Sequence, residues 1–216
     1  MNLTPIRLWR IRVTDAKTGA FLRRGGLLSL FFLTSLLCLP SKPVRADQGK
    51  DLFDHGKYEE AVAWWKQASL SRNDHEAEFR LGDYYESGVV EPENLPEAAK
   101  WYELAAKGGH VAAQFALGSF YEAGAGLSPS PESAAYWYGE CARRNHANCQ
   151  FNLGRLASSG PPEKQDLVAA YKWYYLAAKN GFLEFDAEEL TKLGARLSSA
   201  QKKEAVKQAV AFKPVE

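Results

Sequence analysis

Two cysteines stand close enough in the sequence to link two neighbouring helices covalently. Cys141 falls near the end of one predicted helix, and Cys149 falls in the first turn of the next. Neighbouring segments hold alanine at the equivalent positions, which are Ala105 and Ala177 for the first cysteine and Ala77 and Ala113 for the second. Because such small residues leave little between the helices, a disulfide is geometrically reasonable, and we predict one between Cys141 and Cys149. The alternative is a pair of buried thiols that replace alanine.

Two short motifs match those of serine enzymes that act on β-lactams. Ser199-Ala-Gln-Lys202 has the S-x-x-K spacing, and Lys17-Thr-Gly19 has the K-T-G sequence. The second motif lies in an N-terminal segment that we expect to be removed, and the first opens a highly charged helix. We therefore interpret both as coincidental and predict no catalytic residues.

The histidines are the remaining candidates for metal ligands. His110 and His146 lie 36 residues apart, at equivalent turns of a repeating pattern, and are too distant from each other to share one ion. No group of His, Cys, Asp and Glu has the spacing of a ligand set. We predict that these histidines are turn residues, and we predict no metal site and no cofactor.

The first 46 residues differ in composition from the rest of the chain. They hold eight Lys or Arg residues and one acid, and they enclose an apolar run from Leu27 to Leu39 that is followed by Val44-Arg45-Ala46. A basic start, an apolar core of this length and small residues before the cleavage point are features of a secretory signal peptide. We predict cleavage after Ala46 and a periplasmic or secreted protein. The alternative is an uncleaved anchor, although a full membrane span needs about 20 apolar residues.

Removal of this segment changes the net charge. The full chain carries +1, whereas residues 47–216 hold 19 basic and 25 acidic residues, a net charge of −6. A mildly acidic protein is a poor partner for nucleic acid. We predict a protein or peptide partner, no nucleic acid, and no stable membrane span after signal cleavage.

The rest of the chain repeats with a period of 36 residues. The aligned columns are Leu81-Gly82, Leu117-Gly118 and Leu153-Gly154; Gly88, Gly124 and Gly160; and Trp101-Tyr102, Trp137-Tyr138 and Trp173-Tyr174. A fixed period of this length is the signature of a solenoid of stacked helix pairs. We interpret the tryptophan column as core rather than as a ligand cage.

Each repeat reads as two helices joined by a loop rich in Gly and Pro. The first helix of the first repeat is predicted over Glu76 to Ser87, where Gly82 indicates a close helix approach because glycine otherwise costs about 1 kcal/mol. The loops end in three potential N-cap residues, Asn94, Ser130 and Asp166. Glu97 adds the spacing of a capping box to the first of them. A further column, Gly109, Asn145 and Gly181, suits a left-handed helix stop.

The combination AxFxLGxxYxxG, a Gly/Pro loop, a cap and then AAxWYxxAAxxG resembles the Sel1-like repeat family, over about residues 47–212. The resemblance implies an all-α fold, a right-handed α/α solenoid of tetratricopeptide-like helix-turn-helix repeats, used as an adaptor between proteins. The Cys-x7-Cys spacing also resembles cysteine-rich members in which such a pair links each repeat. Some of those members have been linked to penicillin binding and β-lactam hydrolysis.

These patterns divide the chain into a signal peptide, three repeats and two capping segments. Residues 1–46 are the signal peptide and 47–72 an N-terminal capping pair, with helices over Gln48 to His55 and Tyr58 to Ser69. The repeats span 73–109, 110–145 and 146–181. Residues 182–216 form the C-terminal cap, with a helix from Phe182 to Leu197, a cap at Asp186 and a last helix from Ser199 to Phe212.

Binding is expected at positions of the first helices that vary between repeats, which stacking would bring onto the concave face of the solenoid. The candidates are Arg80, Asp83, Gln114, Ser119, Asn152 and Arg155. We predict an exported, non-catalytic scaffold, adaptor or regulator of the bacterial envelope. The alternative is a β-lactam- or cell-wall-binding protein with weak hydrolase activity.

Overall fold

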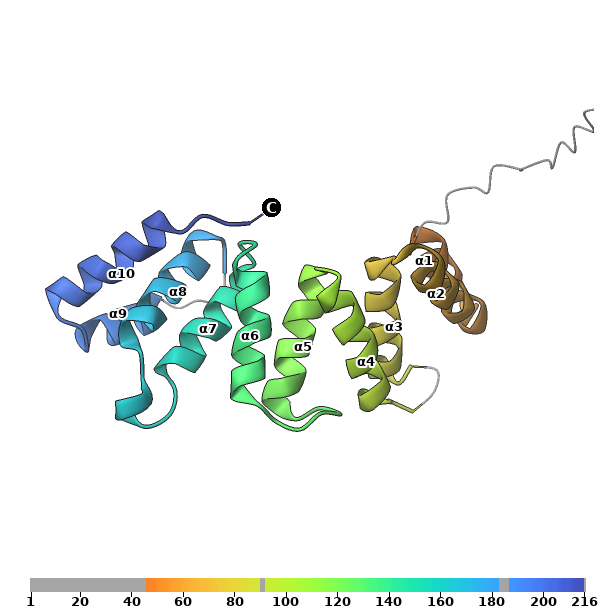
Figure 1. The fold of residues 1–216 in the computed structure, drawn as a ribbon, viewed down its shortest axis with the longest axis horizontal. Coiled ribbons are helices and arrows are strands. Elements are labelled where there is room, and N and C mark those ends of the chain that lie inside the picture. Colours follow the sequence, from red (N-terminus) through yellow and green to blue (C-terminus); the bar gives the residue numbers. More distant parts are fainter. Residues whose placement is uncertain (1–45, 90–91, 183–186, 216) are drawn as a thin grey trace, which may run out of the picture. The chain divides into compact units, whose positions relative to one another are not determined.

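The computed structural model describes residues 46–89, 92–182 and 187–215. These ranges hold ten α-helices and one short 3-10 helix, and no strand (Figure 1). The helices are α1 (Ala46–Asp54), α2 (Tyr58–Arg72), α3 (His75–Ser87), α4 (Leu95–Lys107), α5 (Val111–Ala123), α6 (Pro131–Ala142), α7 (Ala147–Ser158), η1 (Pro162–Lys164), α8 (Leu167–Lys179), α9 (Ala187–Ala195) and α10 (Ser199–Ala211). The predicted signal sequence, apart from its last residue Ala46, and the predicted cap at Asp186 lie outside the described residues. Within the described ranges, no helix has the length and apolar character that a membrane crossing requires.

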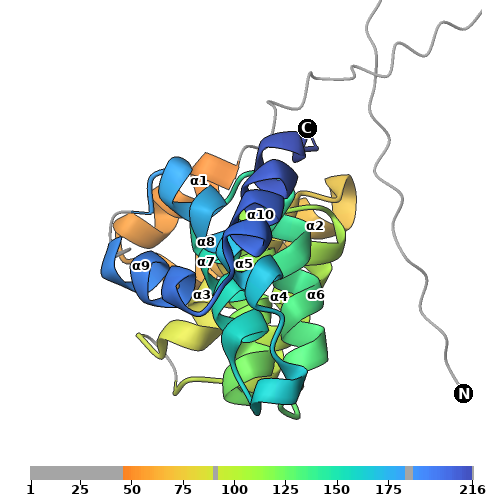
Figure 2. The same ribbon diagram turned by 90° about the vertical axis from the view of Figure 1, so that its left-hand side faces the viewer.

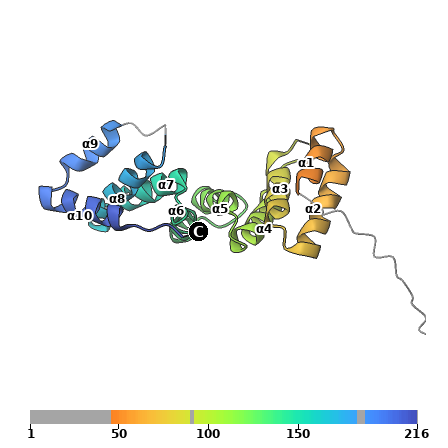
Figure 3. The same ribbon diagram turned by 90° about the horizontal axis from the view of Figure 1, so that it is seen from above.

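The helices stack in the order of the chain. From α1 to α8 each helix packs against the next, as Figures 1 and 3 show. The pairs α3/α4, α5/α6 and α7/α8 are equivalent and correspond to the three sequence repeats; we call their members the first and second helix of a repeat. This arrangement confirms the predicted all-α solenoid of helix pairs.

A tyrosine ring lies directly on the recurring glycine of each repeat. A Cβ atom added to Gly82 would lie 2.4 Å from the ring of Tyr102, and one added to Gly118 would lie 2.6 Å from the ring of Tyr138. The third repeat pairs Gly154 with Tyr174 in the same way, at 2.7 Å. The predicted close approach is therefore confirmed, and its cause is the second residue of the Trp-Tyr pair.

The second helices begin at the predicted caps. The side chains of Asn94, Ser130 and Asp166 each accept a hydrogen bond from the backbone N–H three residues on. Their own backbone N–H groups donate to Tyr85, Tyr121 and Ala157 at 2.7 to 2.9 Å, which closes each loop in the same way. The predicted capping box at Glu97 does not form, because the Asn94 N–H that it would use donates to the Tyr85 carbonyl at 2.7 Å; the Glu97 carboxylate pairs with Lys100 at 2.9 Å. A complete capping box stands at the start of α10, between Ser198 and Gln201.

The joints between repeats have the predicted left-handed residue. Gly109, Asn145 and Gly181 have φ values of 89°, 61° and 86°. At the second joint, Cys141 and Cys149 are fully buried and form a disulfide with a Cα–Cα distance of 6.0 Å. The disulfide therefore joins α6 to α7, as predicted.

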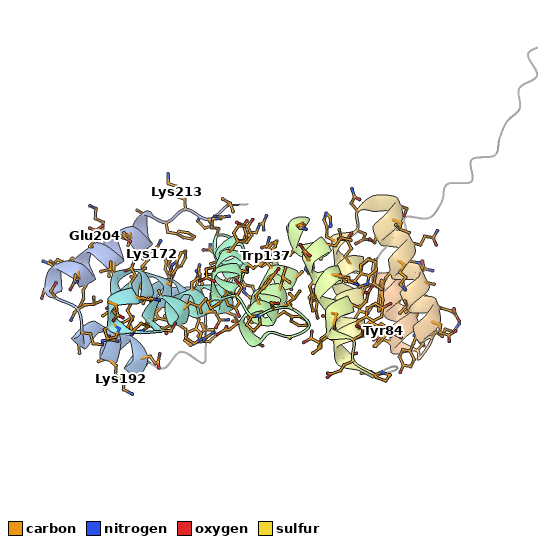
Figure 4. The ribbon with its side chains drawn as sticks, turned by 60° about the horizontal axis from the view of Figure 1, so that its bottom comes forward. Tyr84, Trp137, Lys172, Lys192, Glu204 and Lys213 are labelled. Carbon is orange, nitrogen blue, oxygen red and sulfur yellow. A yellow bond between two sulfur atoms is a disulfide. The ribbon has the colours of Figure 1, made fainter. Side chains whose placement is uncertain are left out.

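The two ends of the array differ from its middle. At the N-terminal end α1 packs against α2, and α2 packs against α3. Tyr84 of α3 packs against the apolar core that these helices share (Figure 4). At the other end α10 lies against α8 in the end-on view of Figure 2. Lys172 of α8 lies 4.2 Å from the ring centroid of Trp173 and 5.8 Å from that of Phe212. Beyond α10 the chain returns to α6, where the Val215 N–H donates to the Arg143 carbonyl.

Candidate protein-binding groove

A groove of about 420 Å³ runs between the first helices of the first two repeats. Its walls come from α3 and α5, and Tyr102 of α4 lies between them. Most of the lining is apolar, whereas Asp83, Glu86 and Ser119 supply polar atoms. The full lining is Phe79, Asp83, Glu86, Tyr102, Ala112, Phe115, Ala116, Ser119, Phe120, Ala123 and Ala125.

Two carboxylates of α3 converge on the Tyr102 hydroxyl. The hydroxyl is placed to donate to Asp83 Oδ1 at 2.9 Å and makes a second, shorter contact with Glu86 Oε2. The pKa of Tyr102 is raised mainly by burial, and the two carboxylates raise it further. This hydroxyl therefore stays protonated. Burial also raises the pKa of Asp83, although the Tyr102 hydrogen bond and the Arg80 charge oppose that rise.

The second repeat builds a similar cluster with a different charge balance. The Tyr138 hydroxyl lies 3.1 Å from Ser119 Oγ and donates to Glu122 Oε2 at 3.2 Å. Arg155 of α7 donates to the same Glu122 oxygen at 2.5 Å. Burial is again the main cause that raises the pKa of the tyrosine. Here the carboxylate has a cation from the next repeat.

The six residues predicted to bind take different positions. Asp83 and Ser119 both line the groove, and Arg155 reaches the adjoining cluster through Glu122. Arg80 pairs with Glu76 at 2.8 Å and with Asp83 at 3.6 Å, and it lines a second hollow of about 260 Å³ that includes Trp65. Asn152 is half-buried on α7.

Gln114 is buried in the seam between two repeats. Only 2% of its surface is exposed. Its Nε2 donates to the Ala106 carbonyl at 3.1 Å, and its Oε1 accepts from Arg144 at 3.1 Å. Gln150 makes the matching bond to the Ala142 carbonyl one repeat later. The structure therefore gives Gln114 a role in joining repeats, because a buried carbonyl at a helix end needs a donor.

Sequence reasoning did not single out Glu86, Glu122 or the hydroxyl groups of the tyrosine column. A signal was present, since Glu86 and Glu122 stand 36 residues apart, as do Tyr102 and Tyr138. From the sequence we interpret the tryptophan column as core and assign no role to the tyrosine hydroxyls beside it. In the structure both tyrosine rings are buried, whereas the Tyr102 hydroxyl contacts Asp83 in the groove and the Tyr138 hydroxyl contacts Ser119 and Glu122.

The histidines, the two disulfide cysteines and Ser199, which are the other candidates for chemistry, do not line the groove. His110 and His146 are N-cap residues of α5 and α7, so both are turn residues as predicted. His146 Nδ1 lies 3.0 Å from Cys149 Sγ, and burial lowers the pKa of this histidine. The thiolates that a metal ion would need here are joined to each other in the disulfide. Ser199 lies in the first turn of α10 and does not line the groove.

These features define a helical-repeat protein with a groove between successive repeats, and comparisons with known proteins give the family. The Sel1 repeat model matches residues 54–73, 75–110, 111–146 and 147–182, more than half of the chain. The chain therefore belongs to the Sel1 repeat family. No protein among the curated sequences matches it.

Two solved structures share the fold. One is a protective antigen present in uropathogenic Escherichia coli strains, which displays an SLR (Sel1-like repeat) fold: the TM-score is 0.66 at 25% identity, over 78% of this chain and 38% of the antigen. The other is a Sel1 repeat protein from Oxalobacter formigenes, with a TM-score of 0.53 at 32% identity, over 63% of this chain and 54% of that one. The chain thus matches about two fifths and about half of these two proteins.

Proposed function

We propose that this protein is an exported, non-catalytic scaffold that holds a segment of a partner protein in the groove between α3 and α5. The observation that carries the proposal is the groove itself, in which apolar side chains of two repeats are left open beside polar atoms. Binding sites for other molecules are typically concave and mostly apolar, with a few placed polar groups. Helical repeats present such surfaces to protein partners.

The proposal retains most of the predicted binding positions. Asp83 and Ser119 contact the bound segment, and Arg80, Asn152 and Arg155 flank it. Gln114 is left out, because both ends of its amide are engaged inside the protein. The Cys141–Cys149 disulfide supports export, since such bonds persist in oxidising compartments.

Site-specific photocrosslinking tests the proposal in envelope fractions of the source cells. A photoreactive residue is placed at Ala116, in the groove, and separately at Tyr136, which is 59% exposed on α6 and outside the groove. We expect a dominant crosslinked protein from position 116 that is missing from position 136. The same product should disappear when Ala123→Trp fills the exposed end of the groove. Identical products from both positions, or a product that survives Ala123→Trp, would refute the proposal.

A further inference from the structure

We propose that the groove recognises a partner segment in which a lysine or arginine stands next to an aliphatic residue, with the cation bound by Glu86 and Asp83. This inference rests on the proposed function and specifies its ligand. It comes from a comparison of two equivalent clusters within the protein, one of which is closed by an arginine and one of which is not.

The two clusters share a tyrosine and a glutamate. Tyr102 contacts Glu86, and Tyr138 contacts Glu122. Both glutamates lie near the C-terminal end of a first helix, where the partial negative charge of the helix adds to that of the side chain. A cation near each carboxylate is therefore favoured both by the charge of the side chain and by the dipole of the helix.

Among the residues with described positions, only the second cluster has a cation. Arg155 binds Glu122, and the residue 36 positions before Arg155 is Ser119. The Ser119 hydroxyl hydrogen-bonds with the Phe115 carbonyl and the Tyr138 hydroxyl, and it carries no charge that could pair with Glu86. Among the residues that the structure describes, no lysine or arginine forms an ion pair with Glu86. Within the described residues, the ion pair that Arg155 makes with Glu122 therefore has no counterpart at Glu86.

The remaining charges near the groove do not neutralise it. Asp83 lies on the same wall as Glu86, and its nearest cation, Arg80, is 3.6 Å away. Arg80 is shared with Glu76, to which it is closer, at 2.8 Å. When Asp83 and Glu86 are both ionised, their two negative charges therefore outnumber the positive charge of Arg80, which is also shared with Glu76. This excess negative charge complements a cationic ligand.

The apolar floor determines what must accompany the cation. The same groove as the carboxylates is lined by Phe79, Phe115 and Phe120 and by alanines of α5. A volume of about 420 Å³ has room for an aliphatic side chain together with the alkyl part of a lysine or arginine, which packs well on apolar surface while its charged end stays with the carboxylates. A small free amine would satisfy the carboxylates but leave the floor open.

Selection from a random heptapeptide display library tests the proposal on the mature chain with its disulfide intact. We expect the enriched peptides to carry a lysine or arginine next to an aliphatic residue. A fluorescent copy of the most enriched peptide should bind Glu86→Gln about tenfold more weakly than the unmodified protein, a change equal to losing one partly exposed charge pair. Glu103→Gln removes the same charge from α4, outside the groove, and should leave the affinity unchanged.

Ser119→Arg is the more demanding variant. It places on α5 the arginine that α7 supplies to the second cluster, so it should occupy Glu86 from within the protein and weaken the same peptide at least as much as Glu86→Gln. Circular dichroism and thermal unfolding confirm that each variant is folded. Spermidine, a free amine, should compete only weakly with the peptide.

The outcomes separate the two proposals. Peptides that bind, are blocked by Ala123→Trp and show no basic preference would overturn this inference and leave the groove as the binding site. Peptides that bind equally well to Ala123→Trp, or a library from which nothing is enriched, would overturn both. Full competition by spermidine would also overturn the inference, because the groove would then bind an amine without a segment of protein.

Discussion

The disulfide between α6 and α7 should contribute measurably to the stability of the array, and Cys141→Ala/Cys149→Ala removes it with little other change. The preceding joint already has alanine at both positions, Ala105 and Ala113, and both are fully buried there. The double variant thus converts one joint into the form that the chain uses at another. The cross-link closes a loop with a sequence separation of 8. The chain-entropy relation gives about 2.5 kcal/mol for a loop of that length.

Urea unfolding of a chain of residues 47–216 measures this contribution. We compare the oxidised protein, the same protein treated with reductant, and the double alanine variant with and without reductant. The oxidised protein should be more stable than the other three by about 2.5 kcal/mol, which corresponds to a melting temperature higher by about 5–10 °C in a chain of this size. Reductant should have no effect on the double variant, because it has no disulfide to lose.

The location of the loss is a second readout of the same change. In a helical repeat each unit contacts only its neighbours, so a weakened joint should open locally. Backbone hydrogen exchange should accelerate in α6 and α7 and change less in α3 and α4. Equal stability of the oxidised protein and the double variant, within about 0.5 kcal/mol, would refute the reasoning, as would free thiols in the mature protein analysed by mass spectrometry without reductant.

Four further predictions follow from single features of the chain. Gly118→Ala should destabilise the protein by about 1–3 kcal/mol in urea unfolding, because the added Cβ would lie 2.6 Å from the Tyr138 ring, whereas Gly139→Ala, with open space around the new atom, should not. Burial lowers the pKa of His146 below 6.5, so the unfolded chain binds a proton more readily and stability should fall as the pH drops from about 7 through the folded pKa; His146→Asn should flatten this slope. Intact mass of the exported protein should place its first residue at Asp47, and a mass that retains residues 1–46 would favour the anchor. A chain of residues 47–216 should not turn over a chromogenic β-lactam, and steady turnover abolished by Ser199→Ala would instead establish the hydrolase alternative.

The sequence predicts the repeats well because the period records backbone and packing requirements that every unit shares. Caps such as Asn94 and Ser130 satisfy the same exposed N–H groups in each repeat. The glycine column was predictable as a close approach, although its partner, the tyrosine ring, was not identified. The prediction of a capping box at Glu97 was wrong, because spacing alone does not show that the Asn94 N–H is taken by the Tyr85 carbonyl, which leaves the Glu97 carboxylate to pair with Lys100.

The candidate site was harder to predict because variable positions serve two purposes. Gln114 and Ser119 both differ from their equivalents in the first repeat, yet Gln114 is buried in the seam and Ser119 lines the groove. The choice between these places depends on where a helix face meets the next repeat, which periodicity along one helix does not give. Gln150, which repeats Gln114 and makes the same bond to a preceding carbonyl, was the available clue to a structural role.

A repeat protein also contains its own reference states, and these allow functional positions to be separated from structural ones. A column that keeps both its residue type and its contact, such as Gly82 and Gly118 under their tyrosines, maintains the fold. Other columns change their residue while the contacts around them stay the same. Ser119 and Arg155 occupy one such column, and each lies beside a repeat that keeps its tyrosine–glutamate contact. A change of this kind alters the surface without altering the fold. The second cluster shows a glutamate that is paired with an arginine. Glu86, which contacts Tyr102 but has no lysine or arginine partner among the described residues, departs from that arrangement. That departure coincides with the groove of about 420 Å³, and this coincidence directs the search for a partner to the first two repeats.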